Sequence, residues 1–364
     1  MDGAFLPRFL QAAMGRGDDG ERRVERPQRM LVHGHQPRVF RVRVALQEMS
    51  DQKIVNDYRL TRTAILDLYE EIRADIDPST ARSHAVPGLV KLLTVLRFLG
   101  TGTFQRVIGC SSGVNQSSVS RHLSQVLRAL KKRAKHYINF PEGEEQQQEI
   151  KQDFSQIAGM PSVLGAIDCT HVLFTPPSDE ELMYLNHKMG YSLNVQVVCD
   201  SNLRILDVAS EFPGSCHDSD ILANSTFGKK LAEGKFGQGW LLGDSGYGCK
   251  PWLMTPLLAP RSEAEKRYNE AHISTRCTIE RTLGVLKSRF NCLHPSGGSL
   301  QYRAQKVSDI VTVCCMLHNI ALRHQVEIAV NVAPSELDIS PPASGSDVAK
   351  GNAVRRKLIE EYFS

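Results

Sequence analysis

Four apolar segments rich in β-branched residues constrain the fold most. They are VLGAIDCTHVLF (163–174), SLNVQVVCD (192–200), RILDVASEF (204–212) and WLLGD (240–244). Segments of this length and composition are typical of strands. Patterns with helical periodicity cover 217–233, 276–290 and 307–324. Three strands, a helix, a further strand and more helices predict an α/β fold with a mixed sheet flanked by helices.

The segment 51–141 predicts a separate, small all-helical domain. Apolar residues recur at helical spacing over 65–72 and 89–96. Further along, the sequence predicts a short helix at 104–108, a Ser/Gly-rich turn at 110–113 and a longer helix opened by Asn115 or Ser117. This order is that of a helix-turn-helix-like DNA-binding domain.

The charge of this helical domain favours a polyanionic partner. From Pro78 to Pro141 the sequence contains no Asp or Glu, whereas Lys and Arg recur throughout. A long block of one sign needs a partner of the opposite sign, although a helical bundle with an incidentally basic surface is the alternative. We therefore expect the domain to bind DNA. The residues predicted to contact DNA are Arg106, Gln116, Ser118, Arg121, His122, Lys131 and Lys132.

Composition divides the rest of the chain. Residues 1–50 are predicted to form a flexible basic arm, 155–330 the strand-containing domain, and 331–364 a Pro/Ser-rich linker with a short carboxy-terminal helix. We expect no membrane partner, because no apolar run approaches the length of a membrane span and the amino terminus lacks the apolar region of a secretory signal. The nine cysteines form no CxxC pair, which favours reduced thiols inside a cell.

Three acidic residues stand where a carboxylate is costly. Asp168 lies in the middle of the first strand, Asp244 ends WLLGD, and Glu280 lies beside the buried stripe of a helix. A lone carboxylate in such surroundings costs several kcal/mol or becomes protonated, so a cation is expected nearby. Carboxylates that converge at one sheet edge can hold Mg²⁺ or Mn²⁺. Such a site suits phosphodiester cleavage, with Asp168, Asp244 and Glu280 as catalytic ligands.

Two other residues allow a second interpretation. Asp218, in FPGSCHDSDIL, is either a metal ligand or a helix N-cap or first-turn acid. Ser245 follows Asp244 in a GDSG sequence that also surrounds the nucleophile of trypsin-like proteases. Such proteases need a His and a buried Asp on an all-β scaffold, which the sequence does not predict. We interpret Ser245 as a turn residue and Asp244 as a ligand.

Five motifs together resemble the transposases of the PIF/Harbinger superfamily and their domesticated vertebrate descendants. They are GAIDCTHV, PGSCHDSDIL, LLGDSGYGCKPWLMTP, RYNEAHISTRCTIERTLGVLKSRFNCL and CCMLHN, and the resemblance covers roughly residues 50–330. It implies an RNase H-like nuclease domain with a DDE triad at Asp168, Asp244 and Glu280. The family's HDS motif falls on His217, Asp218 and Ser219, which implies that Asp218 is a further metal ligand.

The resemblance also leaves two functions open. One is a transposase-derived, divalent-metal-dependent nuclease that acts on DNA phosphodiester bonds without transposition activity. The other is a catalytically inert DNA-binding or adaptor protein. Both imply a Myb-like nuclear partner protein that assists DNA binding and import, and a location in the nucleus and cytoplasm.

Overall fold

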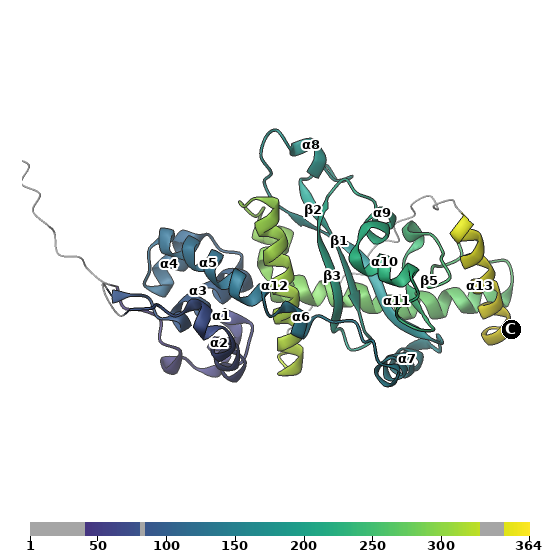
Figure 1. Cartoon of the computed structure of the whole chain (residues 1–364), viewed down its shortest axis with the longest axis horizontal. Helices are drawn as coiled ribbons and strands as arrows, with labels where there is room; N and C mark the ends of the chain where they lie inside the picture. Colours follow the sequence, from purple (N-terminus) through teal and green to yellow (C-terminus); the bar gives the residue numbers. More distant parts are fainter. Residues whose placement is uncertain (1–40, 81–83, 328–345) are drawn as a thin grey trace, which may run out of the picture. The chain divides into compact units, whose positions relative to one another are not determined.

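The protein is described from a computed structural model, which defines residues 41–80, 84–327 and 346–364 (Figure 1). The first part is helical, with α1 (Asp51–Tyr58), α2 (Arg62–Ile76), α3 (Gly88–Thr101), α4 (Gln105–Ser112), α5 (Gln116–Lys131) and α6 (Ala134–Tyr137). The strands are β1 (Val163–Leu173), β2 (Ser192–Cys199), β3 (Ile205–Pro213), β4 (Trp240–Leu242) and β5 (Leu253–Met254). The remaining helices are α7 (Glu144–Ala158), α8 (Glu181–Tyr184), α9 (Asp218–Asn224), α10 (Thr226–Ala232), α11 (Glu263–Arg289), α12 (Ala304–Arg323) and α13 (Ser346–Tyr362).

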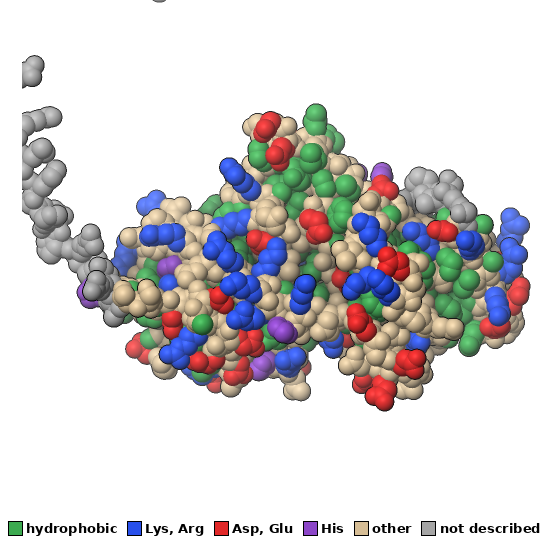
Figure 2. Space-filling model, in the orientation of Figure 1, with side chains coloured by type: hydrophobic (Ala, Val, Ile, Leu, Met, Phe, Trp, Pro, Cys, Tyr) green, Lys and Arg blue, Asp and Glu red, His purple; other side chains and the backbone are tan. Residues whose placement is uncertain are grey.

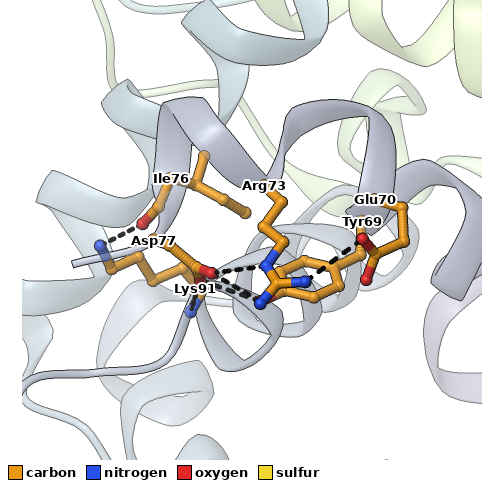
Figure 3. Close-up of polar contacts among 7 residues, drawn as sticks. Tyr69, Glu70, Arg73, Ile76, Asp77 and Lys91 are labelled. Atoms are coloured by element: carbon orange, nitrogen blue, oxygen red, sulfur yellow. Dashed lines mark hydrogen bonds and ion pairs between the residues drawn. The ribbon is translucent and has the colours of Figure 1, made fainter. Parts of the chain in front are cut away.

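A polar network closes the connection between α2 and α3 (Figure 3). Asp77 accepts hydrogen bonds from the Tyr69 hydroxyl at 2.9 Å and from the Gly88 backbone N–H at 2.9 Å. Lys91, although buried, donates to the Ile76 carbonyl at 2.6 Å. The last carbonyls of a helix have no partner within it, so a cation there satisfies an acceptor and complements the helix dipole.

The helix-turn-helix arrangement is present, with different boundaries from those predicted. Residues 110–112, expected in the turn, belong to α4, and the turn itself begins at Gly113. Gly113 has φ +70°, and a Cβ there would come within 2.1 Å of the Val42 carbonyl oxygen, so a side chain is excluded. Asn115 is the residue that precedes α5, as the sequence predicted.

The mixed sheet predicted from the sequence is confirmed. Its strand order is β3-β2-β1-β4-β5, so the first strand lies in the centre. β1 pairs antiparallel with β2, and β2 with β3, whereas β1 with β4 and β4 with β5 are parallel. The four predicted strands begin and end within two residues of the observed ones. The architecture is consistent with the RNase H-like fold.

Two hydrophobic clusters cover the two faces of the sheet. Ala166 and Val172 of β1 pack in the cluster that includes residues of α11 and α12. Leu164 and Ile167 belong to the other cluster, with residues of α9 and α10. The pairing of β1 with β4 is irregular between Val163 and Gly165. Beyond that point side chains alternate, so Asp168 lies on the face of Ala166 and Val172, and Cys169 lies on the face of Ile167.

Several elements were not predicted. α1 and α7 each bury only two side chains, and β5 is only two residues long. The helical pattern at 217–233 is two helices rather than one, because Ser225 ends α9 and caps α10 by accepting a hydrogen bond from the Gly228 N–H. The arm predicted for 1–50 lies largely outside the described residues, as does the linker up to residue 345.

The CCMLHN motif ties α12 to the turn between β2 and β3. His318 donates from Nε2 to the Leu203 carbonyl at 2.9 Å. Asn319 accepts from the Ile205 N–H at 2.9 Å and donates to the Ile205 carbonyl at 2.7 Å. The motif therefore completes backbone hydrogen bonding at the end of a buried hairpin.

Two further properties concern membrane-spanning helices and cysteines. No helix among the described residues combines the length and apolarity needed to cross a membrane. All nine cysteines lie in the described part of the chain, and each is a free thiol.

The burial of His318 predicts a pH-dependent stability. Burial lowers its pKa to about 4, and Arg289 adds to this, while the hydrogen bond to Leu203 opposes it. The folded protein therefore holds the neutral ring, and its contribution is complete above the unfolded pKa of about 6.5 and is lost as the pH falls toward 4. Between pH 7.5 and 5.0, wild type should lose about 2 kcal/mol more unfolding free energy than His318→Gln.

Urea denaturation at the two pH values measures this difference. His136→Gln, a change at an exposed histidine, is the matched control and should follow wild type. An equal pH dependence in wild type and His318→Gln would contradict the prediction.

Candidate functional site

Three carboxylates converge at the centre of the sheet. Asp168, Asp218 and Asp244 each offer an oxygen, and these atoms lie within 4.8 Å of one another. The parallel register pairs Ala166 of β1 with Leu242, the last residue of β4, so Asp168 and Asp244 each stand two residues beyond this pair. Strand pairing therefore brings together two acids that are far apart in the sequence.

Backbone N–H groups orient two of these carboxylates. The Cys169 N–H donates to Asp168 Oδ1 at 2.8 Å, and the Gly246 N–H donates to Asp244 Oδ1 at 3.1 Å. Asp244 thus caps the 3₁₀ turn Ser245–Tyr247, in which Ser245 is the first residue. The interpretation of Ser245 as a turn residue is confirmed.

Asp218 is positioned by a buried amide on the neighbouring strand. Asn194 of β2 donates from Nδ2 to Asp218 Oδ1 at 2.9 Å and to the Cys216 carbonyl at 3.0 Å. The N-cap position of α9 is His217, so Asp218 is not the N-cap but the first residue of the helix. It is both a first-turn acid and a member of the carboxylate cluster.

A buried arginine carries the opposite charge. Arg276 of α11 donates to Asp168 Oδ2 at 3.3 Å and to Glu280, one helical turn further on. Its side chain is 6% exposed. Burial alone would lower the pKa of Arg276, but Asp168 and Glu280 raise it overall. The guanidinium therefore stays charged between the two carboxylates.

The electrostatics of Asp168 reflect this crowding. The pKa of Asp168 is raised to about 7, because burial together with the charges of Asp244 and Asp218 outweighs the opposing effects of Arg276 and the Cys169 N–H. A second positive charge would favour the ionised carboxylate. The three oxygen donors fit a hard divalent cation, because Mg²⁺ and Mn²⁺ prefer carboxylate ligands.

Glu280 occupies a different position from the three aspartates. It lies on α11, as predicted, but it is not part of the three-carboxylate cluster and reaches Asp168 through Arg276. Two further turns along α11, Lys287 donates to the His171 carbonyl of β1 at 3.1 Å. Burial lowers the pKa of Lys287 to about 8, and Lys188 contributes in the same direction.

The sequence interpretation missed Arg276 and Asn194. The signal for Arg276 was its position four residues before Glu280, since side chains at that spacing meet on one helix face. The signal for Asn194 was an amide in the apolar strand SLNVQVVC, where a buried polar group requires a partner.

The predicted DNA-contacting residues divide into exposed and buried ones. Arg106, Gln116 and Arg121 are exposed, and Ser118 is half-buried. His122 is buried, so the expectation that it lies at the surface of α5 is wrong, and burial lowers its pKa to about 4. The inward-facing stripe of α5 is wider than its apolar residues indicate.

The two predicted lysines are exposed and form ion pairs. Lys132 lies 2.6 Å from Asp75 of α2, and Lys131 pairs with Asp309 of α12. Their charges are therefore partly balanced within the chain.

Comparison with known proteins identifies the family. The model of the family described as "DDE superfamily endonuclease" matches residues 167–319, a range that contains all four acids of the site. The mouse (Mus musculus) protein named "Putative nuclease HARBI1" is 37% identical over 339 residues, which cover 92% of this chain and 97% of the mouse protein. The human (Homo sapiens) protein of that name is 36% identical over the same shares.

The chain belongs to the HARBI1 family. The resemblance inferred from the five motifs is thus confirmed. A more distant relative is "Protein ALP1-like" from Arabidopsis thaliana, which is 32% identical over 248 residues, covering 64% of this chain and 60% of the plant protein. No solved structure matches the chain significantly.

The Arg276 bridge predicts a measurable contribution to stability. Replacing Arg276 by Met leaves Asp168 and Glu280 without their buried counter-charge, and breaking such a pair typically costs about 3 kcal/mol. Urea denaturation in the presence of EDTA measures this loss. Arg281→Met, a change at an exposed arginine of the same helix, should cost less than about 0.5 kcal/mol. Equal stability of the two variants would contradict the assigned role.

Proposed function

We propose that the protein is a divalent-metal-dependent endonuclease that acts on DNA phosphodiester bonds. The observation that carries the proposal is the convergence of Asp168, Asp218 and Asp244 within 4.8 Å. The match to the DDE superfamily endonuclease model over these residues supports the same chemistry. We further propose that the protein is a domesticated relative of transposases, without transposition activity.

In this proposal the three aspartates hold Mg²⁺ or Mn²⁺, with Glu280 as the fourth acid of the site. A bound divalent cation polarises a scissile phosphate and lowers the pKa of an attacking water. Hydrogen bonds keep the aspartate oxygens in place; they come from the Asn194 amide and from the Gly246 and Cys169 N–H groups. The carboxylates would therefore need to move little when a cation binds.

Arg276 has a distinct task in this arrangement. Its guanidinium balances the charge of Asp168 and binds Glu280, which lies one turn further along α11. Additional positive charge at the aspartates would repel the guanidinium and weaken its bond to Asp168. Arg276 is therefore a positioning residue for Glu280.

The same ion pairs favour the second candidate, a catalytically inert DNA-binding or adaptor protein. A guanidinium that already neutralises Asp168 and Glu280 stabilises the acidic cluster without any metal ion. In either case we propose a Myb-like nuclear partner and a location in the nucleus and cytoplasm, on the basis of the resemblance to transposase descendants.

Cleavage of supercoiled plasmid DNA tests the first candidate. With Mn²⁺ or Mg²⁺ present, wild type should nick the plasmid. The nicking rate of Asp168→Asn or Asp244→Asn should be lower by a factor of about 100 or more, because the charge of a metal ligand is lost. The matched control is Asp220→Asn, which alters an exposed acid in the same turn as Asp218. Equal nicking by wild type and Asp168→Asn would refute the site.

Calorimetric titration with Mn²⁺ near neutral pH separates the two candidates. The nuclease requires saturable binding that Asp218→Asn weakens. Absence of saturable binding in wild type, together with intact DNA binding, would favour the adaptor. Assays repeated with a Myb-like partner protein decide whether inactivity belongs to the isolated chain.

A further inference from the structure

A groove lies between the carboxy-terminal half of α5 and the amino-terminal end of α12. Its volume is about 700 Å³, and its lining includes Leu127 and Arg128 of α5 and Tyr302, Arg303 and Lys306 at the start of α12. A space of this size accommodates a ligand of the dimensions of one or two nucleotides. The groove is separate from the carboxylate cluster, none of whose residues lines it.

Side-chain contacts between α5 and α12 join the two walls of the groove. Lys306 donates to Ser124 of α5 at 3.0 Å, and Lys131 of α5 pairs with Asp309 of α12. The Tyr302 ring also packs edge-on against Phe98 of α3, with 6.1 Å between the two ring centroids. A preformed site of this kind loses little conformational entropy on binding.

Cations outnumber acids in the lining of the groove. Five cations line it, and Asp309 is the acid among the lining residues. The cations are Arg128, Lys131, Lys132, Arg303 and Lys306. Asp309 pairs with Lys131, whereas Arg128 and Arg303 are exposed and form no ion pair with any residue that the structure describes. Figure 2 shows Lys and Arg side chains gathered over α5, α6 and α12.

The beginning of α12 adds to this charge. Arg303 is its N-cap residue, makes no capping hydrogen bond through its side chain, and is followed by a first turn without any acid. Helix amino termini carry partial positive charge and usually attract acids, so two cations there, Arg303 and Lys306, repel the dipole. An anion bound at this end would offset that repulsion and accept hydrogen bonds from backbone N–H groups of the first turn.

The Tyr302 ring contributes an aromatic wall. Lys306 Nζ lies 4.6 Å from its centroid, and Gln105 donates to its hydroxyl at 2.6 Å. Burial lowers the pKa of Lys306, while Asp309 opposes this shift. Arg and Lys side chains and a helix amino terminus are groups that contact phosphate oxygens.

We infer that this groove is a phosphate-binding site through which the protein holds the DNA backbone, with Arg128 and Arg303 as its principal contacts. The inference rests on the proposed DNA substrate and deepens it. Two of the residues predicted to contact DNA, Lys131 and Lys132, line this groove. The inference therefore places the main backbone contact at the carboxy-terminal end of α5 and the start of α12, rather than at the amino-terminal half of α5. Arg106, Gln116 and Arg121 are then not the main source of affinity.

DNA binding in EDTA tests the groove independently of cleavage. Fluorescence anisotropy with a 20-base-pair duplex compares full-length wild type with the double variant Arg128→Ala/Arg303→Ala over a range of salt concentrations. The loss of two phosphate contacts should lower the slope of log K against log salt by about 2. Affinity at moderate salt should fall about tenfold or more.

The matched control removes the same charge elsewhere. Arg261→Ala/Arg356→Ala alters two exposed arginines outside the groove and should change affinity less than about threefold. Thermal melting followed by circular dichroism checks that both double variants are folded. Unchanged affinity and unchanged salt slope in the groove variant would overturn the assignment of DNA to this site.

Inorganic tripolyphosphate distinguishes the source of the phosphate. Calorimetric binding of tripolyphosphate to wild type that is lost in the groove variant, together with loss of DNA affinity, supports a backbone site. Loss of tripolyphosphate binding with unchanged DNA affinity overturns the assignment of DNA and indicates a small phosphorylated ligand. A wild type that does not nick DNA even with the Myb-like partner protein present, but needs the groove to bind DNA, refutes the proposed nuclease and retains this inference.

Discussion

The ion pairs of Arg276 hold the centre of the structure together. Strand pairing brings Asp168 and Asp244 close to each other, and a hydrogen bond from Asn194 holds Asp218 beside them. Three carboxylates of like charge therefore lie together in a partly buried site. Such a cluster is unfavourable without positive charge. Arg276 supplies that charge from α11, and the bonds that it makes also fix the position of this helix against β1.

This arrangement explains why one site is compatible with two functions. A cluster of aspartates that needs a positive charge can obtain it from a divalent cation or from Arg276, and the two sources compete for Asp168. Membership in the HARBI1 family and the match to the DDE superfamily endonuclease model agree with retained nuclease ligands. The acids themselves do not decide between cleavage and binding, because both require the same carboxylates to be neutralised.

The sequence predicted the strands and acids well, because these depend on local patterns. Apolar β-branched runs located β1 to β4 within two residues, and the motifs placed four acids that the structure positions in and beside one site. It predicted less where local pattern is weak or misleading. β5 is two residues long, α7 is strongly polar, and Ser225 divides a helical pattern through a side-chain cap that periodicity does not reveal.

The sequence by itself determined the succession of the four longer strands along the chain, the sign of the charge in each segment and the identity of the four site acids. Each of these follows from neighbouring residues. The tertiary structure alone decided that Arg276 rather than Glu280 contacts Asp168, that His122 is buried, and that cations of α5 and α12 share one groove. These outcomes depend on contacts between residues more than a hundred positions apart or on how a helix packs. Periodicity within a segment carries no information about such contacts.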